Sequence, residues 1–213
     1  MMLDSDRYAE VLELLRKEYP DVRPALEYTS PFELLVSTML AAQCTDRQVN
    51  KCTAVLYQKY NTPAQFAEMT EEELEPYIKS CGFFHTKGKN IIAMSRILMA
   101  EYGGEVPRDR DALTKLPGVG RKTANLILGD IYRVPGSVVC DTHCIRICGR
   151  LGLSEGKEPE KVERQLRKVL PPEESSDFCH RIVFFGREVC TARNPKCGEC
   201  PLAPHCSQMT GNP

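Results

Sequence analysis

The sequence predicts an all-α protein. Apolar residues recur at helical spacing in nearly every segment, and capping residues or proline precede many of these segments. Runs that alternate in the manner of a β-strand are absent, residues 137–140 being the one short candidate. The 213 residues are 42% hydrophobic and 27% charged, as expected of a globular protein with a core, in one large or two small domains.

The first expected helices are marked by their apolar faces and by their capping residues. Apolar side chains between Tyr8 and Leu15 share one helical face. Ser30 and Glu33 form a predicted capping box for the second helix, with a proline at its first position. Asp46 is the expected cap of the third helix, which carries apolar residues at helical spacing.

The later helices follow the same signals. Thr70 and Glu73 make another capping box, and Gly82 ends that helix. The periodic segment that follows runs through Tyr102 and stops at Gly103 and the next glycine. Further helices are expected at about 109–115, 121–131, 141–151, 159–170 and 173–185.

Charge is distributed unevenly along the chain. The net charge of −1 argues against a protein that coats DNA by bulk electrostatics. Residues 115–150 nevertheless hold six basic and two acidic residues, and residues 181–213 hold four and two, which indicates a basic face on an acidic body. We expect no membrane contact and no secretory signal, and therefore a cytoplasmic protein, associated with the nucleoid if the source is bacterial.

Four of the eleven cysteines lie close together near the C-terminus: Cys190, Cys197, Cys200 and Cys206, with the spacing C-x6-C-x2-C-x5-C. This segment is poor in large apolar residues, so a metal site would have to order it. Zinc and an iron–sulfur cluster both accept four thiolates. A single C-x2-C pair favours the cluster slightly, and zinc stays open. The other seven cysteines are predicted to be buried packing residues.

Residues 116–124, LPGVGRKTA, predict a tight hairpin that opens directly into a helix. Pro117, Gly118 and Gly120 allow the sharp turn and a close approach of the backbone to a ligand. The N–H groups at the start of the helix can then hold a phosphate. Glycine turns also join helices for purely structural reasons, but the basic residues Arg121 and Lys122 favour the phosphate interpretation.

Lys122 has two interpretations from the residues alone. It is a solvated lysine that pairs with phosphate, or it is an amine nucleophile. The positive end of a helix and partial burial would both favour the neutral amine that a nucleophile needs. Asp141 is the natural carboxylate partner, although Asp-Thr-His before an apolar helix is also an ordinary N-cap.

Three motifs together resemble the endonuclease III family of DNA glycosylases. They are LPGVGRKTA, the VCDTH at 139–143 and the terminal cysteine spacing, which occur in the family's order between about Tyr8 and Cys206. The resemblance implies a helix-hairpin-helix glycosylase fold with two domains. Residues 24–135 would form a six-helix barrel, residues 1–23 and 136–213 a helical cluster domain, and the active site would lie in the cleft between them.

The resemblance also assigns roles to matching residues. Lys122 matches the nucleophile that attacks C1′ of the damaged nucleotide and forms a Schiff base, and Asp141 matches the carboxylate that assists it. The four terminal cysteines match the ligands of a [4Fe-4S] cluster. Gln43 matches the residue that fills the space left by the flipped base. The full set of implied DNA contacts is Gln43, Phe83, Pro117, Gly118, Val119, Gly120, Arg121, His143, Arg193 and Lys196.

The predicted function is a bifunctional glycosylase and abasic-site lyase, a monomer acting on oxidised pyrimidines in damaged double-stranded DNA. Bacterial relatives commonly have serine at Ala41 and often leucine at Phe83, so the preferred lesion stays open. Phe83 either intercalates or belongs to the core. Lys122 and Thr38 differ from the adenine-excising branch. The remaining alternatives are a non-catalytic DNA-binding module and a monofunctional glycosylase in which Asp141 activates water.

Overall fold

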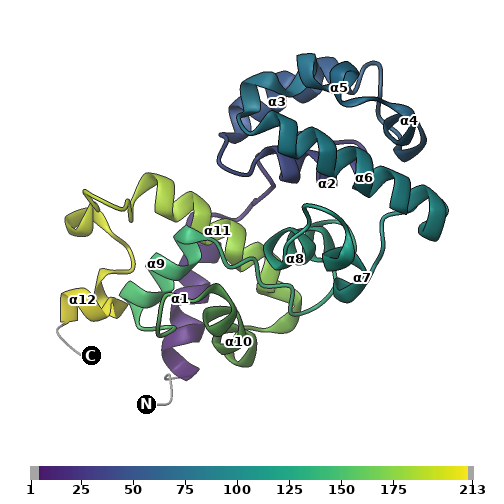
Figure 1. The fold of residues 1–213 in the computed structure, drawn as a ribbon. Coiled ribbons are helices and arrows are strands. Elements are labelled where there is room, and N and C mark those ends of the chain that lie inside the picture. The colour runs from purple at the N-terminus through teal and green to yellow at the C-terminus, as the bar shows by residue number, and fades with distance from the viewer. Residues whose placement is uncertain (1–4, 211–213) are drawn as a thin grey trace. The chain divides into compact units, whose positions relative to one another are not determined.

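The computed structural model describes residues 5–210, and every regular element in this range is helical (Figure 1). The all-α prediction is confirmed. The chain divides into two compact units, Pro24–Tyr132 and a second unit of residues 1–23 and 133–213. The sequence prediction placed this boundary at residue 135. Within the described range, no helix combines the length and apolar character that crossing a membrane requires.

The Pro24–Tyr132 unit is built around its longest helix, α6 (Phe84–Tyr102). Helices α4 and α5 pack along α6, α3 lies beside α5, and α2 contacts α3, α6 and α8 (Figure 1). Helix α7 precedes α8 and packs against it. The remaining elements are α2 (Pro31–Leu40), α3 (Asp46–Leu56), α4 (Pro63–Glu68), α5 (Glu71–Ile78), η1 (Lys79–Cys81), α7 (Arg110–Lys115) and α8 (Arg121–Asp130).

Side-chain caps begin most of these helices, with two departures from the predictions. Thr45, and not Asp46, caps α3, because its hydroxyl accepts a hydrogen bond from the Gln48 amide at 3.3 Å. Ser30 caps α2 as predicted, but Glu33 does not complete the capping box, since its carboxylate binds the amide and hydroxyl of Thr29.

The other predicted capping box is present, and a further one was missed. The reciprocal bonds of Thr70 and Glu73 begin α5, which confirms that prediction. Thr62 and Gln65 form the same motif at the start of α4, a helix that the sequence analysis did not predict. Six residues are too short for a clear apolar period, so the capping motif was the signal available.

Helix α2 supplies the centre of the core in this unit. Eight of its ten residues are buried, and Leu34, Leu35 and Leu40 are fully enclosed. The ring of Phe32 meets that of Phe66 edge to face, with centroids 5.3 Å apart. Such complete burial fixes the position of α2, and therefore also the start of the segment that follows Leu40.

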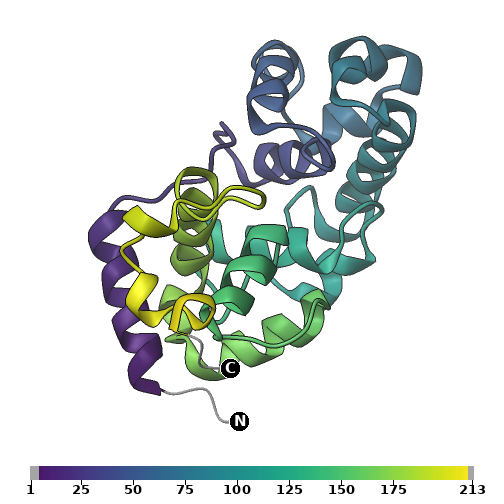
Figure 2. The ribbon, with the colours of Figure 1, turned by 90° about the vertical axis from the view of Figure 1, so that its left-hand side faces the viewer.

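The second unit joins the N-terminal helix to the C-terminal part of the chain. Helix α11 packs against both α1 and α9, and Figure 2 shows α1 beside the C-terminal segment. Arg7 makes that contact, donating to the His205 carbonyl at 2.9 Å and the Ser207 hydroxyl at 2.8 Å. The elements are α1 (Ser5–Glu18), α9 (Thr142–Leu151), α10 (Pro159–Val169), η2 (Pro172–Glu174), α11 (Ser175–Glu188), η3 (Cys197–Glu199), η4 (Ala203–His205) and α12 (Ser207–Thr210).

Residues 137–140, the one candidate strand, do not form a strand. The Val138 amide donates to the Gly136 carbonyl at 3.1 Å, closing a tight turn. The Val139 amide donates to the thiol of Cys179 on α11 at 3.2 Å. The backbone donors of this extended segment therefore have partners without a neighbouring strand, which is what a sheet would otherwise supply.

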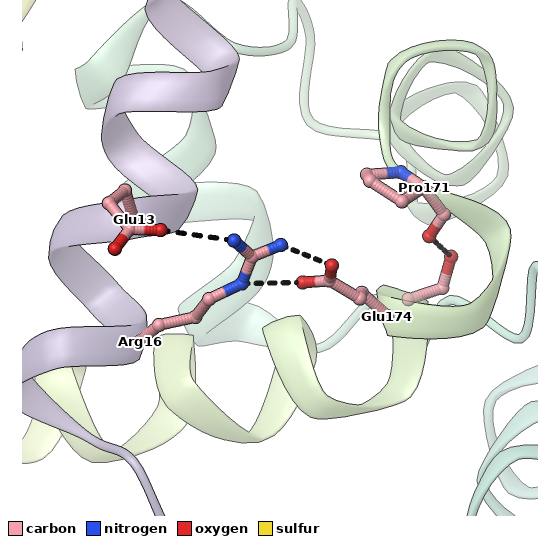
Figure 3. Close-up of polar contacts among 5 residues, drawn as sticks. Glu13, Arg16, Pro171 and Glu174 are labelled. Carbon is pink, nitrogen blue, oxygen red and sulfur yellow. Dashed lines mark hydrogen bonds and ion pairs between the residues drawn. The ribbon is translucent and has the colours of Figure 1, made fainter.

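Two polar contacts fix α1 within its unit. Figure 3 shows Arg16 between two carboxylates, bonded bidentately to Glu174 and at 3.1 Å to Glu13. The hydroxyl of Tyr8, which is buried, donates to the carbonyl of Leu153. Burial raises the pKa of Tyr8 far above its ordinary value, so this donor keeps its proton at all physiological pH values.

We expect Tyr8→Phe to lower the free energy of unfolding by about 1–3 kcal/mol, because the buried Leu153 carbonyl loses its donor. Urea titration measures the change. Tyr19→Phe is the matched control, since the Tyr19 hydroxyl binds Glu188 at an exposed position, and it should cost no more than about 0.5 kcal/mol. Equal losses for the two variants would contradict the assignment.

Candidate functional site

The predicted hairpin is present between α7 and α8. Its turn is closed by the Val119 amide, which donates to the Leu116 carbonyl at 3.1 Å, and both side chains are buried. Gly120 is the N-cap residue of α8 and provides no side-chain cap. No side chain of the N-cap residue therefore covers the start of α8, as a phosphate site at a helix N-terminus requires.

The two glycines of the hairpin serve different purposes. Gly118 has φ of +77°, and a Cβ atom there would lie 2.8 Å from Cε of Met39 and 3.0 Å from Cβ of Asn90. Gly120 has φ of −89°, and a Cβ atom there would meet nothing within 4 Å. Gly118 is thus required by the fold itself, whereas Gly120 keeps open the space in front of the helix.

Lys122 lies in the first turn of α8, and its side chain is exposed. The expected partial burial of this lysine is therefore wrong. The buried face of α8 is formed by Ala124, Asn125, Ile127 and Leu128, which places position 122 on the side of the helix away from the core.

Asp141 is the N-cap residue of α9, as its sequence context predicted. Its Oδ1 accepts a hydrogen bond from the Cys144 amide at 2.8 Å, and the side chain is half-buried. A carboxylate in this position is stabilised by the helix dipole and held in one orientation. His143 follows in the first turn and is also half-buried, with Nδ1 3.1 Å from Nη2 of Arg146.

Gln43 and Phe83 share a backbone feature that the sequence analysis did not predict. Their φ values are +56° and +48°, in the left-handed region that non-glycine residues rarely adopt. Both side chains are exposed, Phe83 to 66%, which excludes its alternative assignment to the core. Both line one cavity of about 250 Å³ with Met39, Ala42, Thr86, Lys87, Asn90 and Gly118.

In the described residues, no three Cys, His, Asp or Glu side chains are arranged as a metal site, but the four terminal cysteines lie around one cavity. Cys190, Cys197, Cys200 and Cys206 all line one cavity of about 170 Å³. Burial and the nearby thiols raise the pKa of Cys200. Thiolates that line one cavity repel one another, and a positively charged centre would offset that repulsion. The donor set therefore fits an iron–sulfur cluster or zinc.

Two arginines hold the cysteine segment, and the sequence analysis counted them only as basic charge. Arg150 on α9 donates to Sγ of Cys190 at 3.3 Å and to the Thr191 carbonyl at 2.8 Å. Arg146, one turn earlier, donates to the Cys190 carbonyl at 3.1 Å. Their spacing of four residues was the available signal, because it places both on one face of the helix. Arg193 and Lys196, the expected DNA contacts in this segment, are exposed.

The seven other cysteines follow the packing interpretation. Six are buried: Cys52, Cys81, Cys140, Cys144, Cys148 and Cys179; Cys44 is half-buried. Hydrogen bonding to Cys140, Cys148 and Cys179, together with burial, raises the pKa of Cys144. These buried sulfur atoms pack as small apolar side chains.

Comparison with known proteins identifies the family. Residues 36–172 match the model of the HhH-GPD superfamily of base excision DNA repair proteins. Residues 190–206 match the iron–sulfur binding domain of endonuclease III. Endonuclease III of Escherichia coli K12 is 45% identical over 197 residues, covering 92% of this chain and 93% of that protein. The chain belongs to the endonuclease III family.

Solved structures of endonuclease III agree with this assignment. A non-covalent endonuclease III–DNA complex has a TM-score of 0.92 and 43% identity, covering 99% of this chain and 98% of that one. A trapped covalent endonuclease III–DNA intermediate has the same TM-score and identity. Membership of the family also indicates iron–sulfur rather than zinc at the four cysteines.

We expect Gly118→Ala and Gly120→Ala to separate folding from ligand access. Gly118→Ala should lower stability by about 1–3 kcal/mol, because φ is positive and the methyl group meets Met39 and Asn90. Gly120→Ala should leave stability within about 0.5 kcal/mol and weaken binding to duplex DNA. Thermal unfolding and fluorescence anisotropy measure the two effects, and full DNA affinity in Gly120→Ala would contradict the phosphate site.

Proposed function

We propose that this protein is a bifunctional DNA glycosylase and abasic-site lyase of base excision repair. It removes oxidised pyrimidines from duplex DNA and cuts the strand 3′ to the abasic site. The observation that carries the proposal is the exposed Lys122 in the first turn of an uncapped helix, directly after a hairpin built to accept phosphate. A primary amine is thereby placed where the backbone of bound DNA would lie.

Binding to DNA begins at the hairpin. The backbone at the start of α8 and the positive end of this helix accept a phosphate, and the basic residues around them add electrostatic attraction. Arg193 and Lys196, exposed on the cysteine segment, contribute further phosphate contacts. These contacts position the duplex without reading its sequence, which suits an enzyme that searches for a damaged base. The enzyme acts on damaged double-stranded DNA as a monomer.

The damaged nucleotide is then turned out of the helix, since its C1′ atom is inaccessible in stacked DNA. Gln43 enters the space left by the base, and Phe83 stacks against the opened step. The exposure of both side chains and their shared cavity support these roles. An aromatic ring offers a larger stacking surface than an aliphatic side chain, which favours insertion at a base step.

Lys122 carries the covalent chemistry. Its neutral amine attacks C1′, the glycosidic bond breaks, and the base leaves with the bonding electron pair. Loss of the amine proton and opening of the sugar ring give a Schiff base. Removal of a proton from C2′ then expels the 3′ phosphate, and water hydrolyses the Schiff base to release the lysine. This last hydrolysis returns Lys122 to its starting state.

Asp141 stabilises the positive charge that develops on the sugar and assists the transfer of protons. A carboxylate fixed by its helix cap is already oriented before the substrate arrives, so little reorganisation is needed in the transition state. His143, beside it on α9, lines the pocket for the flipped nucleotide.

We propose further that Cys190, Cys197, Cys200 and Cys206 hold a [4Fe-4S] cluster. When bound, the cluster would cross-link through its thiolate bonds a segment that lacks an apolar core. Arg150 and Arg146 orient this segment from α9, so that Arg193 and Lys196 are presented from a fixed backbone. The protein acts in the cytoplasm, at the chromosome.

The lyase is tested by borohydride reduction in the presence of duplex DNA with an abasic site or thymine glycol. We expect a covalent adduct with the wild-type protein and none with Lys122→Ala, because reduction traps only an imine. Lys115→Ala, an exposed lysine in the last turn of α7, is the control and should form the adduct normally. A wild-type protein that excises the base without an adduct would be a monofunctional glycosylase, and one that only binds would be a DNA-binding module.

The cofactor is tested by metal analysis. We expect about four iron atoms per chain and an absorption band in the blue part of the spectrum. Cys200→Ala should lose both, whereas Cys44→Ala, which changes a thiol outside the site, should retain them. Stoichiometric zinc without iron would refute the cluster.

A further inference from the structure

Lys87 is a buried cation that the proposed chemistry does not use. It lies near the start of α6, is only 7% exposed, and has a pKa lowered by burial. Its Nζ donates to the Leu40 carbonyl at 2.8 Å and to the Cys81 carbonyl at 2.7 Å. An ammonium group removed from water needs such partners, and these two are well-formed hydrogen bonds.

The two acceptors are both helix ends. Leu40 is the last residue of α2, and Cys81 is the last residue of η1. Carbonyl groups at a helix C-terminus lack partners within the helix and carry the negative end of its dipole. One ammonium group therefore joins the C-termini of two helical elements that lie about 40 residues apart in the sequence.

The segments that leave these two ends carry the residues proposed to enter DNA. Gln43 follows Leu40 by three positions, and Phe83 follows Cys81 by two. Both have left-handed backbone conformations, which are strained for residues other than glycine and persist only where the surroundings enforce them. Lys87 itself lines the cavity that Gln43 and Phe83 share.

We propose that Lys87 is a positioning residue, which holds the Gln43 and Phe83 segments together so that both side chains enter the duplex as one rigid unit. The inference rests on the proposed function. Without the ammonium bridge, each segment can relax from its strained backbone independently. Insertion would then require the two segments to be ordered at the moment of binding, which slows the flipping step.

The test uses Lys87→Met, which replaces the apolar stem of the side chain with one of similar shape and removes the donors. We expect single-turnover excision of thymine glycol to fall on the order of 10- to 100-fold, while affinity for undamaged duplex stays within about twofold. The fluorescence of 2-aminopurine next to an abasic analogue, which rises as the stack opens, should show a reduced amplitude. Lys87→Arg, which retains donors and charge, should recover part of the rate and of the amplitude.

Lys89→Met, an exposed position on the same helix, is the matched control and should behave as the wild type. Lys87→Gln is measured in parallel, since it retains one donor group. Normal rates and amplitudes in a folded Lys87→Met would overturn the inference, as would an equal loss of binding to undamaged DNA. If neither Lys87→Met nor Lys87→Gln folds, Lys87 is a residue of the core and the inference is wrong.

These outcomes are distinct from a failure of the proposed function. Wild-type protein that forms no borohydride adduct and excises no base would refute the glycosylase and lyase. Wild-type protein that does both, with a Lys87→Met variant equal to it, would refute the positioning role alone.

Discussion

The backbone groups left unpaired at helix ends are the constraint on which this structure depends. In an all-α fold every helix has such groups, and most of them here are satisfied by side-chain caps or turns. Three of these helix ends are informative. The start of α8 has no cap, the start of α9 is capped by Asp141, and the ends of α2 and η1 share the ammonium of Lys87. Each of these ends bears on the proposed reaction.

Apolar packing holds these helix ends in fixed positions. Leu116 and Val119 are buried and hold the hairpin in place, so the hairpin backbone keeps its conformation without a bound ligand. The burial of eight of the ten residues of α2 fixes the point at which the Gln43 segment begins. The cysteine segment is the opposite case. It has little core of its own, and depends on hydrogen bonds from Arg146 and Arg150 and on the centre that its thiols bind.

Where the structure differs from the sequence-based predictions, two neighbouring groups could have filled the same structural role. Thr45 and Asp46 are both good caps, and only the backbone geometry decided that Thr45 occupies the N-cap. Glu33 had two possible amides within reach and bonded that of Thr29. Residues 137–140 have the composition of a strand, but no second strand approaches them in the described part of the chain.

The sequence by itself determined most of the helices, the hairpin, the Asp141 cap and the cysteine spacing, because these depend on residues close together in the chain. Only the tertiary structure decided that Lys122 and Phe83 are exposed, since exposure depends on which helix faces pack. It also decided the strained backbones of Gln43 and Phe83 and the two acceptors of Lys87. These features depend on contacts between segments that are distant in sequence, and a local sequence pattern does not encode such contacts.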